Sequence, residues 1–295
     1  MPPPPEAAGT IYDIGYRHYD GPRLGRRGAI GAIVAAGLRA VFGLGRSGKS
    51  KILPWGAVIL GLIPAVVAVA IRVLAGDLID LYRYENYLWE IGALFPIFIA
   101  AQAPELVVND MRHRVLPLYF SRPIGRLDYV VAKLVALSIS LLALSLLPVL
   151  VLFIGRVLGS QDALGALGDE IGSLPSILGS GALHAVVLAS IGLAVCAVAG
   201  RRAYAAASVL AIFLVGGVIS SILEEEGAAD LPTYAPFTNP LAILDGAREW
   251  LWGGSVAGSP VDTAALPLPI YGLATLVLVA ISWAVLTLRY RSLAT

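Results

Sequence analysis

The sequence is poor in the residues that most often build metal centres and covalent catalytic sites. Among 295 residues it has one cysteine and three histidines, and only 14% of its residues are charged. Cys196 has no second thiol with which to form an internal disulfide or a thiolate metal site. His18, His113 and His184 do not form a metal-binding pair at helical spacing. We therefore expect no metal or other cofactor in the chain, and no nucleic-acid partner.

Apolar residues are abundant instead. They make up 58% of the sequence, and the mean hydropathy is +0.80, which is far more apolar than a soluble domain of this size needs to be. Six runs are long enough to cross a hydrocarbon core about 30 Å thick as helices. They are Leu53–Leu74, Leu88–Val108, Tyr129–Leu158, Ile177–Gly200, Ala203–Leu223 and Leu268–Leu288. The sequence therefore predicts an all-α membrane protein with six transmembrane helices.

Charged residues are segregated along the chain. Of the 21 Lys and Arg residues, 17 fall before the first run, between the second and third or in the first residues of the third, between the fourth and fifth, or after the sixth. The alternate connections carry most of the acidic residues, including Glu224, Glu225 and Glu226. By the positive-inside rule both termini are cytoplasmic. We expect a multi-pass protein of a bacterial plasma membrane.

This orientation predicts three parts of the chain. A cytoplasmic N-terminal segment covers residues 1–52, the transmembrane domain covers 53–288, and a cytoplasmic tail covers 289–295. Within the transmembrane domain, the first cytoplasmic loop covers 109–129 and the longest outer loop covers 224–267. The outer loop contains its own helical pattern over Asn239–Trp252.

Between Gly28 and Leu44, apolar residues recur at helical spacing while Arg39 points the opposite way. This pattern predicts an amphipathic helix in the cytoplasmic membrane interface. A core-facing helix of a small soluble domain is the alternative, but too few residues precede the helix to build such a core.

The next residues, Gly43–Ser50 (GLGRSGKS), match the phosphate-loop pattern G-x-x-x-x-G-K-[ST]. A phosphate loop needs a buried strand before it and a later strand with a carboxylate for magnesium. Here a helical pattern precedes the loop and a membrane span follows it. We therefore interpret Arg46, Lys49 and Lys51 as anchors to anionic lipid headgroups.

A basic segment with a proline lies between the second and third runs. Met111–Phe120 alternates basic and apolar residues, which predicts a short helix at the membrane surface. Pro123 then favours extended backbone, Gly125 allows a turn, and Asp128 is suited to cap the third span. The pattern predicts a rigid cytoplasmic elbow.

Leu116–Lys133 (LPLYFSRPIGRLDYVVAK) resembles the corresponding loop in membrane subunits of type 2 ABC exporters, and Tyr12–Arg26 is similar to their opening segment. The resemblance implies an interfacial connecting helix, six spans, a coupling helix that docks on a separate ATPase subunit, and a pair of permeases. ATP and magnesium would then bind the ATPase. The residues that would map to the coupling elbow are Arg112, Arg114, Leu118, Tyr119, Arg122 and Arg126. The alternative is that the arginines are ordinary inside-loop positive charges.

Few residues within or beside the spans suggest a substrate path. The candidates are Glu90, Glu105, His184, Trp250 and Trp252. Polar groups with structural hydrogen bonds, and aromatic interface anchors, are the alternatives. Since charge is scarce in the spans, the predicted function is outward transport of a hydrophobic or amphipathic substrate, such as a lipid, a drug-like compound or a peptide. The alternative function is a non-transporting membrane partner that relays ATPase motion to an envelope enzyme or sensor.

Overall fold

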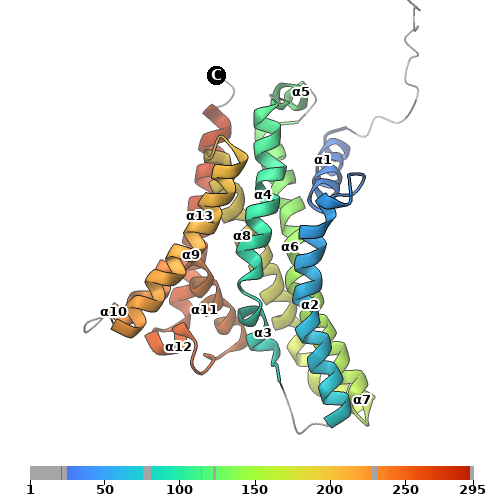
Figure 1. The fold of residues 1–295 in the computed structure, drawn as a ribbon, viewed down its shortest axis with the longest axis vertical. Coiled ribbons are helices and arrows are strands. Elements are labelled where there is room, and N and C mark those ends of the chain that lie inside the picture. Colours follow the sequence, from blue (N-terminus) through green and yellow to red (C-terminus); the bar gives the residue numbers. More distant parts are fainter. Residues whose placement is uncertain are drawn as a thin grey trace, which may run out of the picture.

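The computed structural model describes residues 21, 25–75, 81–113, 115–121, 124–226 and 231–292. All regular secondary structure in these ranges is helical. The elements are α1 (Gly25–Val41), α2 (Lys49–Ala75), α3 (Tyr84–Glu90), α4 (Leu94–Arg112), α5 (Leu116–Phe120), α6 (Arg126–Gly159), α7 (Ala163–Glu170), η2 (Ile171–Ser173), α8 (Leu174–Val198), α9 (Arg202–Glu226), α10 (Leu231–Tyr234), η3 (Ala235–Thr238), α11 (Pro240–Trp252), α12 (Pro260–Ala264) and α13 (Leu268–Ser292). Figure 1 shows the long helices running side by side along the longest axis.

Five of these segments are long and apolar enough to cross a membrane, and there are six if the bent pair α3 and α4 is one span. The all-α fold with five or six candidate spans is therefore confirmed. The helices α2, α6, α8, α9 and α13 coincide with five predicted runs, with ends that differ by up to four residues. As a result, α2 begins inside the predicted 1–52 segment, and α6 begins inside the predicted 109–129 loop.

The second span is bent by 61° between α3 and α4, so the run Leu88–Val108 is not one straight helix. Gly92 lies in the break, where an added Cβ atom would be 2.9 Å from the Trp89 carbonyl oxygen. Pro96 is the third residue of α4, a position whose N–H would have no acceptor within the helix. A glycine and a proline four residues apart thus end one helix and start another.

The helices α6 and α8 form the centre of the bundle. Buried residues make up 56% and 72% of their most apolar stretches, against 22% for α9 and α13. With 34 residues, α6 is about 51 Å long at 1.5 Å per residue, which exceeds a hydrocarbon core of about 30 Å. One helix therefore joins both ends of the molecule.

The helix α1 lies beside the first turns of α6 and runs in the same direction. Arg26 of α1 contacts Asp128 of α6, and eleven residues later Gly37 lies so close to Ala136 that an added Cβ atom would be 2.7 Å from the Ala136 Cβ atom. The predicted helix over Gly28–Leu44 is present as Gly25–Val41, and its place in a membrane interface stays a prediction.

The long connection between α9 and α13 is folded. Asn239 caps α11 through a hydrogen bond from the Leu241 N–H at 3.0 Å, and Gly253 ends the helix with a left-handed φ of 81°. The helix predicted over Asn239–Trp252 is confirmed. It packs on α8, where the Trp252 indole N–H donates to the Ser180 hydroxyl at 3.0 Å.

Candidate functional site

The helix α5 lies at the end of the molecule where α13 finishes (Figure 1). Pro117 is in its first turn, which is a favourable place for proline at a helix start. Leu116 is buried, whereas the Leu118 side chain is 69% exposed. This short helix therefore has one side fixed to the bundle and one apolar side chain that is mostly exposed.

The side of α5 that faces the bundle contributes Tyr119 and Phe120 to an aromatic cluster. The other members of the cluster are Tyr129 of α6 and Tyr290 of α13. The Tyr119 ring lies 5.5 Å and the Phe120 ring 6.4 Å from the Tyr129 ring, measured between centroids. Tyr129 in turn lies 5.4 Å from Tyr290. Aromatic pairs at these spacings are attractive beyond the area they bury. Through this cluster, α5 is packed on both α6 and α13.

A buried polar group extends the same contact to α4. The Tyr129 hydroxyl donates to Asp110 Oδ2 at 2.7 Å, and Lys133 Nζ lies 2.7 Å from the same oxygen. Lys133 is almost wholly buried, so its charge requires this partner. The Asp110 carboxylate therefore joins the last turns of α4 to the first turns of α6.

Three further contacts fix the start of α6. Asp128 accepts from the Gly125 N–H at 2.9 Å, as predicted for a cap, and pairs with Arg26 in a two-bond contact at 2.7 and 2.8 Å. Arg126 donates to the Arg291 carbonyl at 3.1 Å, which joins α6 to the end of α13. Together with the aromatic cluster and the Asp110 contacts, these contacts join α1, α4, α6 and α13 beneath α5. This set of contacts is the base of α5.

The predicted elbow residues are distributed around this base. Leu118 and Tyr119 lie on α5, Arg126 begins α6, and Arg112 ends α4 with an exposed side chain. Arg114 and Arg122 lie outside the described residues.

Glu105, a candidate for a substrate path, is instead paired on both sides. One carboxylate oxygen contacts Arg46 in the α1–α2 connection, and the other lies 3.0 Å from Arg202 Nη1 at the start of α9. The Glu105 side chain is only 7% exposed. Through its two arginine partners it joins the α1–α2 connection, α4 and α9.

Arg46 belongs to the loop that matches the phosphate-loop pattern. The loop follows the helix α1, and no strand occurs in the described ranges. Its Ser50 hydroxyl donates to the Ser47 carbonyl at 2.7 Å, and Gly43 packs against Ser50. The loop is closed on itself and connects α1 to α2.

A second polar group is buried where α8 meets α11. His184 Nε2 lies 3.7 Å from Asp245 Oδ1, and Arg248 Nε lies 3.2 Å from the same oxygen. Asp245 and the exposed Glu90 both line a cavity of about 830 Å³ between the α3–α4 bend, α9 and α11. Asp245, a carboxylate that sequence patterns did not select, thus lies next to His184 and lines the same cavity as Glu90.

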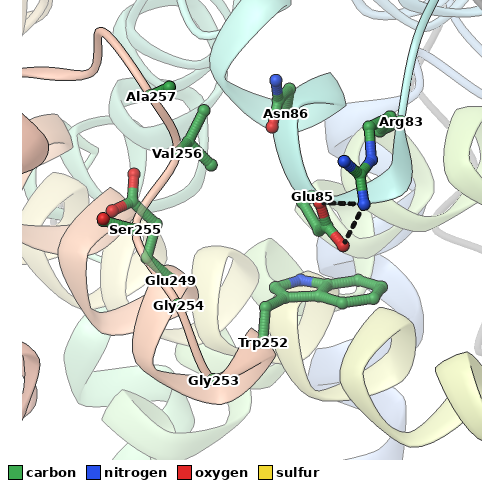
Figure 2. Close-up of a pocket in the computed structure, with 10 residues that line it drawn as sticks. All are labelled: Arg83, Glu85, Asn86, Glu249, Trp252, Gly253, Gly254, Ser255, Val256 and Ala257. Atoms are coloured by element: carbon green, nitrogen blue, oxygen red, sulfur yellow. Dashed lines mark hydrogen bonds and ion pairs between the residues drawn. The ribbon is translucent and has the colours of Figure 1, made fainter.

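The two tryptophan candidates lie apart from this cavity. Trp250 is half exposed and lines an apolar cleft of about 350 Å³ with α8 and α13. Trp252 lines a polar pocket with Glu249 and the start of α3 (Figure 2). The five path candidates therefore belong to several separate environments.

The chain belongs to the ABC-2 family of transporter proteins. The model of this family matches residues 90–290, which is more than half of the chain and includes every span after the first except the α3 half of the bent one. The protein is therefore a type 2 ABC transporter permease. No curated protein matches the sequence.

Proposed function

We propose that this permease is the membrane subunit of an ATP-driven exporter, and that α5 is the helix on which a separate ATPase subunit docks. The observation that carries the proposal is the combination of an exposed Leu118 with a base tied to α4, α6 and α13. A coupling element must offer a partner an apolar anchor and must also be stiff enough to pass on displacement.

In this proposal α5 and both termini are cytoplasmic. ATP and magnesium bind the ATPase subunit, whose closure displaces α5. The aromatic cluster passes the displacement to α6 and α13, and the Asp110–Lys133 pair passes it to α4. Because α4 continues into a 61° bend, its movement changes the mouth of the cavity beside α9.

We propose that this cavity belongs to the substrate path and that a second permease completes it. Its lining combines apolar side chains of α9 with Glu90, Glu224 and Glu225. Such a mixed surface suits a hydrophobic or amphipathic substrate, such as a lipid, a drug-like compound or a peptide. Export occurs across the plasma membrane, with membrane lipids against the exposed faces of α2, α9 and α13.

The docking role is tested by Leu118→Asp in the full-length permease co-expressed with its candidate ATPase subunit. A charge on the exposed edge of α5 removes the apolar anchor while leaving the buried base intact. We expect at least about a tenfold loss of ATPase recovery, since loss of a central anchor costs about 2 kcal/mol or more. The matched control is Leu164→Asp on α7 at the other end, where the leucine is 83% exposed.

Equal complex formation and equal ATP hydrolysis in both variants would contradict the coupling role of α5. Transport is tested separately in proteoliposomes with fluorescent lipids and lipophilic dyes. ATP-dependent export of any of them supports the exporter function. Hydrolysis with no flux of any probe would instead favour a relay to an envelope enzyme or sensor.

A further inference from the structure

A pocket of about 440 Å³ lies between α3, the end of α11 and the loop that follows α11, in the half of the molecule away from α5 (Figures 1 and 2). Its volume is in the range of sites for small organic molecules. The lining residues that matter here are Glu249, Trp252, Glu85, Arg83 and Asn86.

Glu249 is the unusual member of this lining. The residue is almost fully buried, at 1% exposure, and neither carboxylate oxygen accepts a hydrogen bond at normal length, although Ser259 and the Val256 N–H lie near enough to interact with it. A buried carboxylate without partners is costly, because each buried acceptor lacks the bonds that water would supply. A ligand that donates a hydrogen bond to the Glu249 carboxylate would therefore stabilise it.

The charges around Glu249 do not balance. Arg248, its neighbour on α11, is 3.2 Å from Asp245 and is compensated by it. Across the pocket, Arg83 pairs with Glu85 at 3.3 Å. Asp245 and Glu249 thus share the single charge of Arg248, and Arg83 is paired with Glu85, so the three carboxylates exceed the two arginines by one negative charge. The pocket therefore attracts a cation.

Trp252 forms an aromatic wall of the same pocket (Figure 2). Its ring stacks on Tyr84 at 6.3 Å between centroids, and its N–H is bonded to Ser180. Arg156 covers Tyr84 at 4.6 Å. The indole is thereby held in place while part of it remains open to the pocket, and indole is the best natural surface for an organic cation.

The loop above the pocket is also fixed. Gly253 turns the chain back over the end of α11, and the Ser255 hydroxyl and the Gly258 N–H both donate to Asp262 at 3.1 Å.

The described residues contain no group of three side chains able to hold a metal ion. The chemistry thus favours an organic cation over a metal.

We propose that this pocket binds an organic ammonium group, with Glu249 as its counter-ion and Trp252 as its aromatic wall. The group is carried either by a soluble amine or by an aminophospholipid headgroup, since both present the same charge. The proposal stands on the geometry of this pocket and does not depend on ATPase docking at α5.

The test is equilibrium dialysis of the purified full-length protein in detergent against radiolabelled ethanolamine. We expect saturable binding that Glu249→Gln weakens at least about tenfold, because a buried charge pair loses one partner. Asp169→Asn is the control, since Asp169 is an exposed carboxylate on α7 that lines neither this pocket nor the cavity beside α9. Ethylene glycol, which lacks the charge, should not compete.

The source of the ammonium group is distinguished by nanodiscs that contain phosphatidylethanolamine or phosphatidylglycerol. Displacement of ethanolamine only by the former indicates a lipid headgroup, and binding unaffected by either indicates a soluble amine. No saturable binding in detergent together with no effect of Glu249→Gln on phosphatidylethanolamine retention would overturn the proposal. Equal binding by wild type and Glu249→Gln, or full displacement by KCl at equal ionic strength, would overturn it too.

The pH dependence offers an independent readout. Burial raises the pKa of Glu249, although the nearby Ser259, Arg248 and Val256 N–H act to lower it. The other ionisable groups around it are Asp245 on α11, Tyr271 on α13, and the Arg83–Glu85 pair on the α3 side. Ethanolamine affinity should fall as the pH drops through this raised pKa, and affinity independent of pH would contradict the role of Glu249.

Discussion

At the scale of single residues, Gly37 controls how closely α1 approaches α6. In Gly37→Ala the added methyl group would be 2.7 Å from the Ala136 Cβ atom, so the two helices must move apart. Overpacking of this kind costs about 1–3 kcal/mol. We expect a lower midpoint of thermal unfolding in detergent for the variant.

The control for Gly37→Ala lies two turns earlier in the same helix. An added Cβ atom at Gly31 meets nothing within 4 Å, so Gly31→Ala should be neutral or stabilise α1 by up to about 1 kcal/mol through helix propensity. Equal thermal midpoints for the two variants would show that α1 does not pack on α6.

Glu249 gives a second prediction, on stability without an ammonium ligand. Its pKa in the folded protein is raised above the ordinary value of 4.5, so the folded state holds its proton to higher pH than the unfolded state does. As pH rises from 4.5 through the raised pKa, wild-type stability should fall. Glu249→Gln has no carboxyl group to ionise at this position, so its stability does not fall in this way. The variant should be the more stable protein at pH 7.

The measurement is the thermal midpoint of both proteins between pH 4.5 and 8, with Glu90→Gln as the exposed control. The advantage of Glu249→Gln should shrink toward pH 4.5. If the variant is less stable than wild type at pH 7, Glu249 has a stabilising partner and its carboxylate is not unsatisfied.

Residue contacts were predictable only where they are local. The Asp128 cap follows from Gly125, three positions earlier. The partners of Glu105 lie 59 positions before it, at Arg46, and almost a hundred after it, at Arg202. No periodicity encodes such pairs, because the approach of three helices creates them. For the same reason the burial of Glu249 appears only in the folded structure.

At the scale of elements, the bend between α3 and α4 depends on Gly92. In Gly92→Ala the new Cβ atom would lie 2.9 Å from the Trp89 carbonyl oxygen, so the break must open. We expect a changed distance between spin labels placed at the exposed Leu81 and Arg112, on either side of the bend. An unchanged distance distribution would show that Pro96 and packing set the 61° angle without the glycine. Gly56→Ala in α2, with open space around it, is the control.

Long elements were predictable because uninterrupted apolar runs leave a helix as the only way to satisfy the backbone within a membrane. The five uninterrupted candidate spans follow from this rule. The bend does not follow from it, because Leu88–Val108 is apolar on both sides of Gly92 and hydropathy does not report a change in the direction of the helix axis. The base of α5 was missed in part as well: Tyr290 lies about 170 positions from Tyr119, and only the bundle brings the two rings to Tyr129.

At the scale of the whole molecule, α6 makes orientation testable. It is a single helix of 34 residues, with α5 just before its start and α7 just after its end (Figure 1). Ser121 and Leu164 are both exposed, and they flank the two ends of α6. The single native thiol, Cys196, is buried and is removed by Cys196→Ala, so a cysteine placed at either position reports on one side of the membrane alone.

In that background, a membrane-impermeant maleimide applied to intact cells should label Leu164→Cys and leave Ser121→Cys unlabelled. Inside-out vesicles should give the opposite pattern, because the basic segments of the sequence favour a cytoplasmic α5. Labelling of Ser121→Cys in intact cells would place α5 on the outer face, out of reach of any cytoplasmic ATPase. That result would also place the Glu249 pocket on the cytoplasmic side without altering its geometry. It would therefore contradict ATPase coupling at α5 and leave the proposal of ammonium binding at Glu249 unaffected.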